Sequence, residues 1–215
     1  KAKKAGIEVV LVDTTVNNPK KVAVSEISSN NYAGGAAALR AVKRAGVSGG
    51  KVMGIGVRPG ISTTDARDAG FKDAVAKDSN FEFIGQEYSQ NEPAIAAQIT
   101  SAAIAANPDL KAIFASNLFS AQGAATGIKQ AGKEGEIIVI GFDAGPDQIK
   151  ALKDGTVQAL IAQKPYNIGT QGVTQALRAI KGKSNKSKIT TGFTILTPKN
   201  VNTNFGQKAA YRSKC

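Results

Sequence analysis

Short apolar runs rich in β-branched residues alternate with helix-like segments along almost the whole chain. Clear examples of the runs are residues 7–13 (IEVVLVD), 51–57 (KVMGIGV) and 137–143 (IIVIGFD). Helix-like segments, such as residues 31–45 with Ala and Leu at helical spacing, separate them. Strands that are apolar throughout and alternate with helices build parallel sheets covered on both faces. The sequence therefore predicts an α/β protein with parallel, doubly wound sheets.

The same pattern places the other elements. Further strands are expected at residues 21–29, 81–88, 112–117, 157–163 and 190–196. Helices are expected at residues 31–45, 62–77, 92–106, 120–131, 146–153 and 168–181. In this prediction residues 182–188 are a polar loop, and residues 199–215 are a loosely held tail.

The first six residues (KAKKAG) are typical of the last turns of a helix. Basic side chains favour the C-terminal end of a helix, and Gly6 stands where helices commonly end in a left-handed conformation. Because the chain opens inside a helix and without Met, we expect it to be a fragment or a processed product. A signal peptide or a lipid anchor would then lie upstream.

The net charge of +12 could indicate binding to nucleic acid or to an acidic surface. The lysines are dispersed near turns and helix ends, however, and no aromatic residues that could stack on bases are interleaved with them. The dispersed set includes Lys1, Lys3, Lys4, Lys20, Lys21, Lys181, Lys183, Lys186 and Lys188. A solvated basic surface is the favoured interpretation, and no nucleic-acid partner is expected.

Metal sites and nucleophilic catalysis have little support. The chain has no His, and its single cysteine, Cys215, is the last residue. Zinc sites, internal disulfides and Ser-His or Cys-His triads are therefore excluded or nearly so. The phosphate-binding patterns GxxxxGK[ST] and GxGxxG are absent, and Asp13, Asp65 and Asp143 have no further support as paired catalytic carboxylates. We expect no enzyme, no metal and no cofactor.

Polar and aromatic side chains follow the predicted strands, at the edge where doubly wound sheets place their ligand sites. They are Asp13, Thr14, Arg58, residues 88–91, Asn117, Phe142, Asp143 and Gln163. Carboxylates and amides exchange hydrogen bonds with hydroxyl groups, and an aromatic ring can lie against a flat C–H face, so a sugar or polyol fits this set. Any single Asp or Asn could instead cap a helix or a turn. Taken together, the set favours a binding cleft.

The chain resembles the type I periplasmic sugar-binding proteins of ABC importers, the ribose-binding-like family. The motifs that carry the resemblance stand in the family's order: residues 30–35 (NNYAGG), 62–64 (STT) before Arg67 and Gly70-Phe71, 107–115 (NPDLKAIFA), 137–155 (IIVIGFDAGPDQIKALKDG), 159–163 (ALIAQ), Pro165 and Ile168-Gly169. The similarity extends from residue 5 to about residue 198.

The resemblance implies two Rossmann-like lobes joined by three crossovers. On that pattern residues 1–29 and 164–192 form an incomplete N-terminal lobe, and residues 30–163 and 193–199 form the C-terminal lobe. Residues 200–215 are the tail. The family's first strands and helices, with the ligand residues that they carry, are expected to be missing from this sequence.

Carried over position by position, the resemblance implies that Asp13, Asn117, Asp143 and Gln163 hydrogen-bond to sugar hydroxyls. It also implies that Phe142 packs beside the sugar ring. The other ligand-binding residues that we predict are Thr14, Asp65 and Gln90.

The sequence also departs from the family pattern. The family often has Arg where Asp65 stands and an aromatic residue near Gln90, and Trp is absent from this chain. The acidic residue that usually follows the Asn is replaced by Leu118, and Phe119 comes next. These departures indicate a pocket that is not shaped for ribose itself, so another pentose, a hexose or a sugar alcohol is expected.

The resemblance implies a protein in the periplasm or outside the cell that captures its ligand by hinge closure and then docks on the membrane permease of an ABC importer. A LacI-type transcription repressor has an effector domain of the same fold, which is the alternative; it would need an upstream helix-turn-helix. Residues 200–215 and 162–166 (AQKPY) are more typical of importer proteins. An enzyme on a related α/β fold is the least favoured interpretation.

Overall fold

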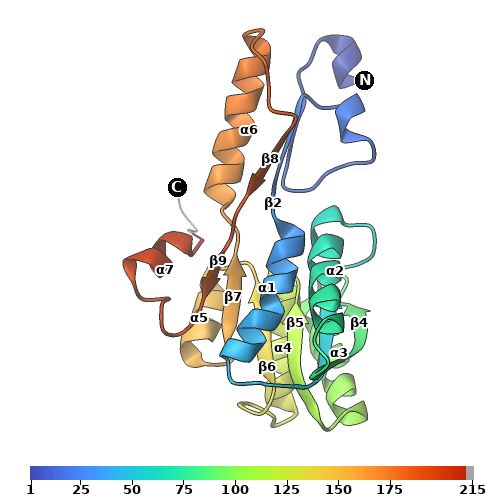
Figure 1. Cartoon of the computed structure of the whole chain (residues 1–215), viewed down its shortest axis with the longest axis vertical. Coiled ribbons are helices and arrows are strands. Elements are labelled where there is room, and N and C mark those ends of the chain that lie inside the picture. Colours follow the sequence, from blue (N-terminus) through green and yellow to red (C-terminus); the bar gives the residue numbers. More distant parts are fainter. Residues whose placement is uncertain (212–215) are drawn as a thin grey trace. The chain divides into compact units, whose positions relative to one another are not determined.

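The computed structural model describes residues 1–211, which form two compact units (Figure 1). Unit 1 consists of Lys1–Asn30 and Gln163–Phe193, and unit 2 consists of Asn31–Ala162 and the chain from Thr194 onward. Both units contain parallel strands alternating with helices, as the apolar runs predict.

Unit 1 has a three-stranded parallel sheet in the order β1-β2-β8. Its elements are the 3-10 helices Ala2–Ala5 and Pro19–Lys21, the strands β1 (Val10–Val12), β2 (Ser25–Ser29) and β8 (Lys188–Thr191), and the helix α6 (Pro165–Ile180). Helix α6 packs against all three strands. Gly6 follows the first 3-10 helix with a φ of 71°, which is the left-handed end that the sequence predicts.

Unit 2 has a six-stranded sheet in the order β4-β3-β5-β6-β7-β9. Its strands are β3 (Gly50–Gly56), β4 (Phe81–Tyr88), β5 (Leu110–Ala115), β6 (Ile138–Phe142), β7 (Ala159–Ala162) and β9 (Thr194–Leu196). The pairs from β4 to β7 are parallel, and β9 pairs with β7 in the antiparallel direction. The carboxyl ends of β3 to β7 therefore meet at one edge of the sheet.

Helices cover both faces of the unit 2 sheet. The helices α1 (Asn31–Arg44) and α2 (Ser62–Ala76) pack together on one face, which is toward the viewer in Figure 1. The helices α3 (Pro93–Ala106), α4 (Leu118–Gln130) and α5 (Pro146–Asp154) lie on the other face, and α7 (Asn204–Ala209) packs beside β9. Most of the apolar side chains of β5 and β6 are consequently fully buried.

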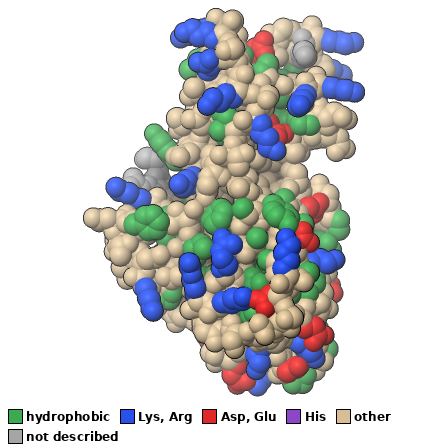
Figure 2. Space-filling model, viewed as in Figure 1, with side chains coloured by type: hydrophobic (Ala, Val, Ile, Leu, Met, Phe, Trp, Pro, Cys, Tyr) green, Lys and Arg blue, Asp and Glu red, His purple; other side chains and the backbone are tan. Residues whose placement is uncertain are grey.

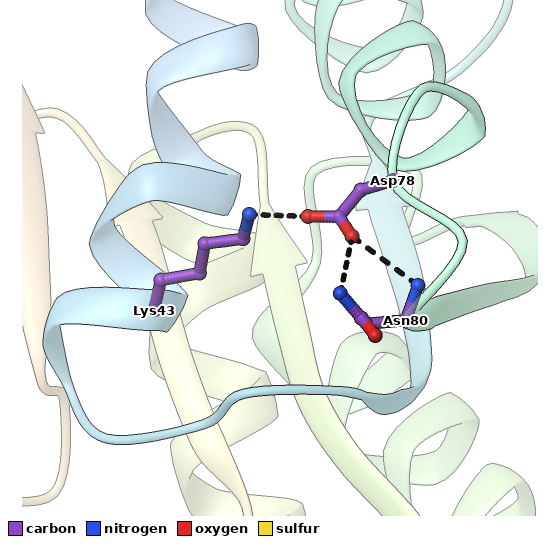
Figure 3. A network of polar contacts seen from close by, with 3 residues as sticks. All are labelled: Lys43, Asp78 and Asn80. Atoms are coloured by element: carbon purple, nitrogen blue, oxygen red, sulfur yellow. Dashed lines mark hydrogen bonds and ion pairs between the residues drawn. The ribbon is translucent and has the colours of Figure 1, made fainter.

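Small residues let α1 and α2 approach closely. A Cβ atom on Gly35 would lie 1.9 Å from the carbonyl oxygen of Arg67, and one on Gly70 would lie 2.1 Å from that of Tyr32. At the far end of the pair, Lys43 makes an ion pair with Asp78, whose Oδ1 accepts hydrogen bonds from Asn80 (Figure 3). Close backbone contact and the contacts of Lys43 and Asn80 with Asp78 therefore hold the two helices together.

Two sequence predictions about the C-terminal part were wrong. Residues 190–196 are not one strand: β8 belongs to unit 1 and β9 to unit 2, because the chain crosses between the units at Gly192 and Phe193. Residues 199–211 are not a loose tail either. Val201 is 3% exposed, Thr203 caps α7 by accepting from Gly206 N, and Tyr211 N donates to Ala144 O at 2.9 Å.

The basic residues are spread over the surface. In Figure 2 Lys and Arg side chains are scattered over the visible face of both units, with Asp and Glu among them. Within residues 1–211 the structure has no helix that is both long enough and apolar enough to cross a bilayer. Cys215, predicted to lie in a frayed end, is outside the described residues.

Candidate ligand-binding site

The winding of the unit 2 sheet reverses between β3 and β5. The chain goes from β3 through α2 to the edge strand β4, and then returns through α3 to β5 on the other side of β3. Ligands of doubly wound proteins bind at such a switch point, at the carboxyl ends of the strands. The loops after β3, β4, β5 and β6 are therefore the place to look for a site in this unit.

Two asparagine side chains meet at this edge. Asn117 follows β5 and donates from Nδ2 to Asn91 Oδ1, which follows β4, at 2.6 Å. The Oδ1 atom of Asn117 accepts from Ser120 N at 2.9 Å and so caps α4. Asn117 is thus a helix cap, the alternative that its position after a strand left open, and it is also half-exposed at the predicted edge. The cap holds its side chain in one orientation.

The loop after β4 has a backbone that L-residues adopt rarely. Gln90 and Asn91 have φ values of 56° and 67°. The loop is held by Ser89, whose hydroxyl lies 3.1 Å from Gly56 O and 2.9 Å from the Ser120 hydroxyl. Both Gln90 and Asn91 are exposed at the edge. Strained backbone held by buried hydrogen bonds is common at ligand sites.

Asp65 lies in the first turn of α2 and serves the loop before that helix. Its Oδ2 accepts from Gly60 N at 2.9 Å. This contact closes the loop that starts at Arg58, after β3. Asp65 is half-buried at this edge of the unit 2 sheet, and one of its carboxylate oxygens is bound to the backbone.

Arg67 is buried beneath the edge and connects three elements. It is 3% exposed; its Nε donates to Asn31 Oδ1 of α1 and its Nη1 donates to Ser116 O after β5, both at 2.9 Å. Its guanidinium carbon lies 3.7 Å from the centre of the Phe142 ring. A buried guanidinium with both carbonyl-type acceptors and an aromatic face is well compensated for its loss of water.

Phe142 and Asp143 end β6. The Phe142 ring is fully buried between Arg67 and α1, because Gly34 leaves room for it: a Cβ there would lie 2.7 Å from the ring. Asp143 turns out of the strand with a φ of 79°, and its Oδ1 accepts from the Tyr211 hydroxyl at 3.0 Å. The carboxylate is half-buried and held by the last described residue of the chain.

Asp68, next to Arg67, carries the largest pKa change at this edge. Burial raises the pKa of its carboxyl to about 7. The Ser116 hydroxyl and Arg67 act in the opposite direction, and Asp65 adds to the rise. Burial and the charges of Asp68, Asp65 and Glu87 also raise the pKa of Tyr88. This edge therefore combines a carboxyl that changes its charge close to pH 7 with amides and hydroxyls.

The predicted residues of unit 1 form a group of their own. Asp13 follows β1 with a φ of 65°, and its buried Oδ1 has no hydrogen-bond partner among the described residues. Thr14 is exposed beside it. Gln163 follows β7 but belongs to unit 1, where its Oε1 accepts from the Ser29 hydroxyl at the end of β2 at 2.8 Å. Each lies at the carboxyl end of a strand.

The structure thus brings Asp65, Gln90, Asn117, Phe142 and Asp143 to one sheet edge of unit 2, and Asp13, Thr14 and Gln163 to strand ends of unit 1. Their roles as ligand contacts stay predictions.

Several residues of this edge were not singled out as site residues. They are Asp68, Ser116 and Tyr211, together with Asn31 and Arg67, which appeared only as parts of motifs. An Arg three and four residues before Gly70 and Phe71, and so on the same face of the predicted helix, is the signal that could have found Arg67. No cluster of three or more His, Cys, Asp or Glu side chains suitable for a metal occurs within the part of the chain that the structure describes.

Comparison with known proteins matches residues 1–184 to the periplasmic binding protein domain family. The ribose import binding protein of Salmonella typhimurium is 34% identical over 187 residues, which are 87% of this chain and 62% of that protein. This chain therefore spans less than two thirds of that relative's length.

Solved structures match more of the chain. An ABC transporter solute-binding protein from Agrobacterium vitis, bound with α-D-tagatopyranose, superposes with a TM-score of 0.92 and 37% identity, covering 98% of this chain and 73% of that one. A second solute-binding protein from the same organism, with bound D-fucose, gives a TM-score of 0.90 at 32% identity, again covering 98% and 73%. The α/β architecture with parallel-dominated sheets is the one these proteins have.

Proposed function

Since this chain belongs to the periplasmic binding protein domain family, we propose that it is the greater part of a solute-binding protein that captures a sugar or sugar alcohol for an ABC importer. Units 1 and 2 are the two lobes in this proposal, and the capture step is closure about the segments that connect them. The protein acts in the periplasm or outside the cell and passes its ligand to a membrane permease. We assign it no catalytic step.

The observation that carries the proposal is the edge of unit 2 where Asn91, Asn117 and Asp143 gather at the ends of adjacent loops. Each of these side chains is held in place by a neighbour, so contacts with a ligand would cost little side-chain entropy. Amides and a carboxylate exchange hydrogen bonds with hydroxyl groups, whereas a carboxylate repels a phosphate.

The relatives support the same ligand class. Solute-binding proteins similar to this chain hold D-tagatose and D-fucose in their structures. The departures at Asp65 and Leu118 from the ribose-type pattern stay our reason to expect a ligand other than ribose. These relatives are importer proteins, and the proposal follows them rather than the repressor alternative.

Isothermal titration of the 215-residue chain at millimolar sugar tests the proposal, with D-ribose, D-allose, D-tagatose, D-fucose, L-arabinose and myo-inositol as the panel. We expect heat of binding for at least one of them. The variant Asn117→Ser, which retains a helix-capping oxygen, should lose at least about tenfold in affinity, as removal of a hydrogen bond worth about 1.4 kcal/mol would cause. Silence across the whole panel would contradict the proposal.

A matched control lies on the same unit, away from the edge. Asn107 donates from Nδ2 to Ala103 O at the end of α3. Asn107→Ser should therefore leave the affinity unchanged, while an equal loss in both variants would point to general destabilisation and not to a ligand contact.

A further inference from the structure

Asp68 is a buried carboxyl without a hydrogen-bond partner. The residue is 7% exposed, and within residues 1–211 neither of its oxygens has a partner. The same holds for Ser116 Oγ and Gln86 Oε1. Burial disfavours the ionised form of this carboxyl, because a charge is costly away from water, and the Ser116 hydroxyl and Arg67 offset only part of that cost. The geometry alone therefore favours a proton on Asp68.

The position of this carboxyl is at the switch point of the sheet. A Cβ atom on Gly56, the last residue of β3, would lie 2.4 Å from Asp68 Oδ2 and 3.0 Å from Gln86 Nε2. Asp68 therefore lies against the carboxyl end of β3. Strand β3 is the one between β4 and β5 in the sheet. The loops that carry Asn91 and Asn117 start beside this end of β3, because Ser89 N donates to Gly56 O and Ser116 N donates to Ile55 O.

Few charges face Asp68. From its own helix α2 they are Arg67 and Asp65, and from β4 the titratable group is Tyr88. The other packed elements contribute neutral groups: Ser116 after β5 and Gly56 on β3, with Asn31 of α1 engaged by Arg67. Arg67 is thus the one cation among the groups that act on Asp68 in the described chain.

Arg67 and Asp68 converge on the same turn. Arg67 donates to the carbonyl of Ser116, and the Ser116 hydroxyl acts on Asp68. Ser116 directly precedes Asn117, and Arg67 also covers the Phe142 ring. A neutral acid can donate a hydrogen bond to Ser116, whereas a carboxylate can only accept one and attracts Arg67. Ionisation therefore changes the forces on the Ser116–Asn117 turn and on Arg67 together.

We propose that Asp68 is a positioning residue whose proton keeps Arg67 on the Phe142 ring and the Ser116–Asn117 turn in its ligand-binding arrangement. The inference rests on the proposed function in that the turn carries a predicted ligand residue. When Asp68 loses its proton, Arg67 is drawn toward the carboxylate and ligand affinity falls. Sugar is held below neutral pH and released above it.

The first test needs no ligand. The carboxyl carbon of Asp68 in the 13C-labelled chain, assigned by its loss in Asp68→Asn, should titrate with a midpoint close to the value of about 7. The backbone amides of Ser116 and Asn117 should shift with the same midpoint, and in Asp68→Asn they should not. A carboxyl midpoint near 4, or amides that do not respond in the wild type, would overturn the proposal.

The second test uses whichever sugar of the panel binds at pH 6. Its affinity for the wild type should fall by about fivefold between pH 6 and pH 8, the lower end of usual coupling between sites. Asp68→Asn, which mimics the neutral acid, should keep the pH 6 affinity at both values. Asp73→Asn, on the exposed side of the same helix, should behave as the wild type.

The two tests separate the two claims. Equal pH profiles for wild type and Asp68→Asn overturn the role of Asp68 even when sugar binds. If no sugar binds at any pH, the proposed function fails, and the carboxyl and amide titrations still decide whether Asp68 controls the turn. If Asp68→Asn does not fold, the Ser116 and Asn117 amides of the wild type give the decision: a common midpoint close to pH 7 supports the proposal, and no response there overturns it.

Discussion

Unit 2 and unit 1 bury their apolar side chains to very different extents. Nearly all of the core lies in unit 2; among the described residues, the buried hydrophobic side chains of unit 1 are Ile27 and Ile168. Conversely, eight large hydrophobic side chains of unit 1 are exposed, against three in the part of unit 2 that the structure describes. The eight are Ile7, Val12, Val16, Val22, Tyr166, Val173, Leu177 and Ile180.

The difference follows from how the sheets are covered. The unit 2 sheet has helices on both faces, whereas α6 is the one α-helix described in unit 1. Parallel sheets are normally covered on both faces. Four of the exposed side chains, from Tyr166 to Ile180, recur along α6 at helical spacing and form one apolar stripe. Since the chain spans 62% of a relative's length, unit 1 is an incomplete lobe.

The difference in burial should have its largest effect on stability when one isoleucine in each unit is replaced by alanine. Ile140 of β6 is fully buried, and Ile180 at the end of α6 is 71% exposed. Ile140→Ala should lower the free energy of unfolding by about 4 kcal/mol, because it removes buried methyl groups and leaves a cavity. Ile180→Ala should change it by less than about 0.5 kcal/mol. Urea unfolding followed by circular dichroism measures both changes. Similar losses of stability in the two variants would contradict the difference in burial between the units.

A buried arginine of unit 2 and a more accessible arginine of unit 1 provide a second test of the difference between the units. Arg67→Met should cost about 3 kcal/mol, because Asn31 Oδ1 and Ser116 O lose their charged donor and the Phe142 ring loses its cation. Arg178 of α6 also makes two hydrogen bonds, both to Ser184 O. Arg178→Met should cost at most about 1 kcal/mol, since water can replace it as a donor. The same unfolding experiment checks both variants. A larger loss of stability for Arg178→Met than for Arg67→Met would contradict this prediction.

Two helical glycines should respond with opposite signs. Gly35→Ala places a Cβ 1.9 Å from the Arg67 carbonyl oxygen, so α1 and α2 must move apart, at a cost of about 1–3 kcal/mol. A Cβ atom on Gly169 of α6 would meet no other atom within 4 Å. Gly169→Ala should stabilise by about 0.5–1 kcal/mol, because alanine favours the helix. Thermal unfolding detects the two shifts, and a destabilised Gly169→Ala would contradict the open environment of α6.

The smallest effect concerns acid pH. The Lys43 ammonium and the Asn80 backbone amide hold the pKa of Asp78 below its usual value (Figure 3). Because the folded state prefers the ionised form, this stabilisation is present above the unfolded pKa and is lost as the pH falls through the folded one. The melting temperature of the wild type should therefore fall slightly more than that of Asp78→Asn when the pH is lowered from 5 to 3. Equal falls in the melting temperature of the two proteins would show that the contacts of Asp78 with Lys43 and Asn80 do not contribute to stability.

The sequence predicted what depends on local pattern. Apolar runs such as residues 137–143 and the Gly that ends a helix at Gly6 are set by period and by backbone preference, and the structure has the strand and the left-handed turn there. Placement of Asp143 and Asn117 at one sheet edge followed from parallel strands sharing a direction. No tertiary information was needed for these.

What sequence reasoning missed depends on long-range contacts. The alternation in residues 190–196 is the same whether one sheet or two receive it, so the division into β8 and β9 could not be read from it. Tyr211 reaches Asp143 across 68 positions of the chain, and Arg67 is buried because Asn31, Ser116 and Phe142 converge on it. Such partners are visible only in the folded structure.

The most direct test of the account is the location of the bound sugar on unit 2. Backbone amide NMR of the 15N-labelled chain, titrated with the tightest sugar of the panel, should show the largest shift changes after β4, β5 and β6, at Gln90, Asn91, Asn117 and Asp143. Changes that gather instead around Lys43 and Asp78, at the opposite end of α1 and α2, would contradict a binding site at the carboxyl edge of this sheet.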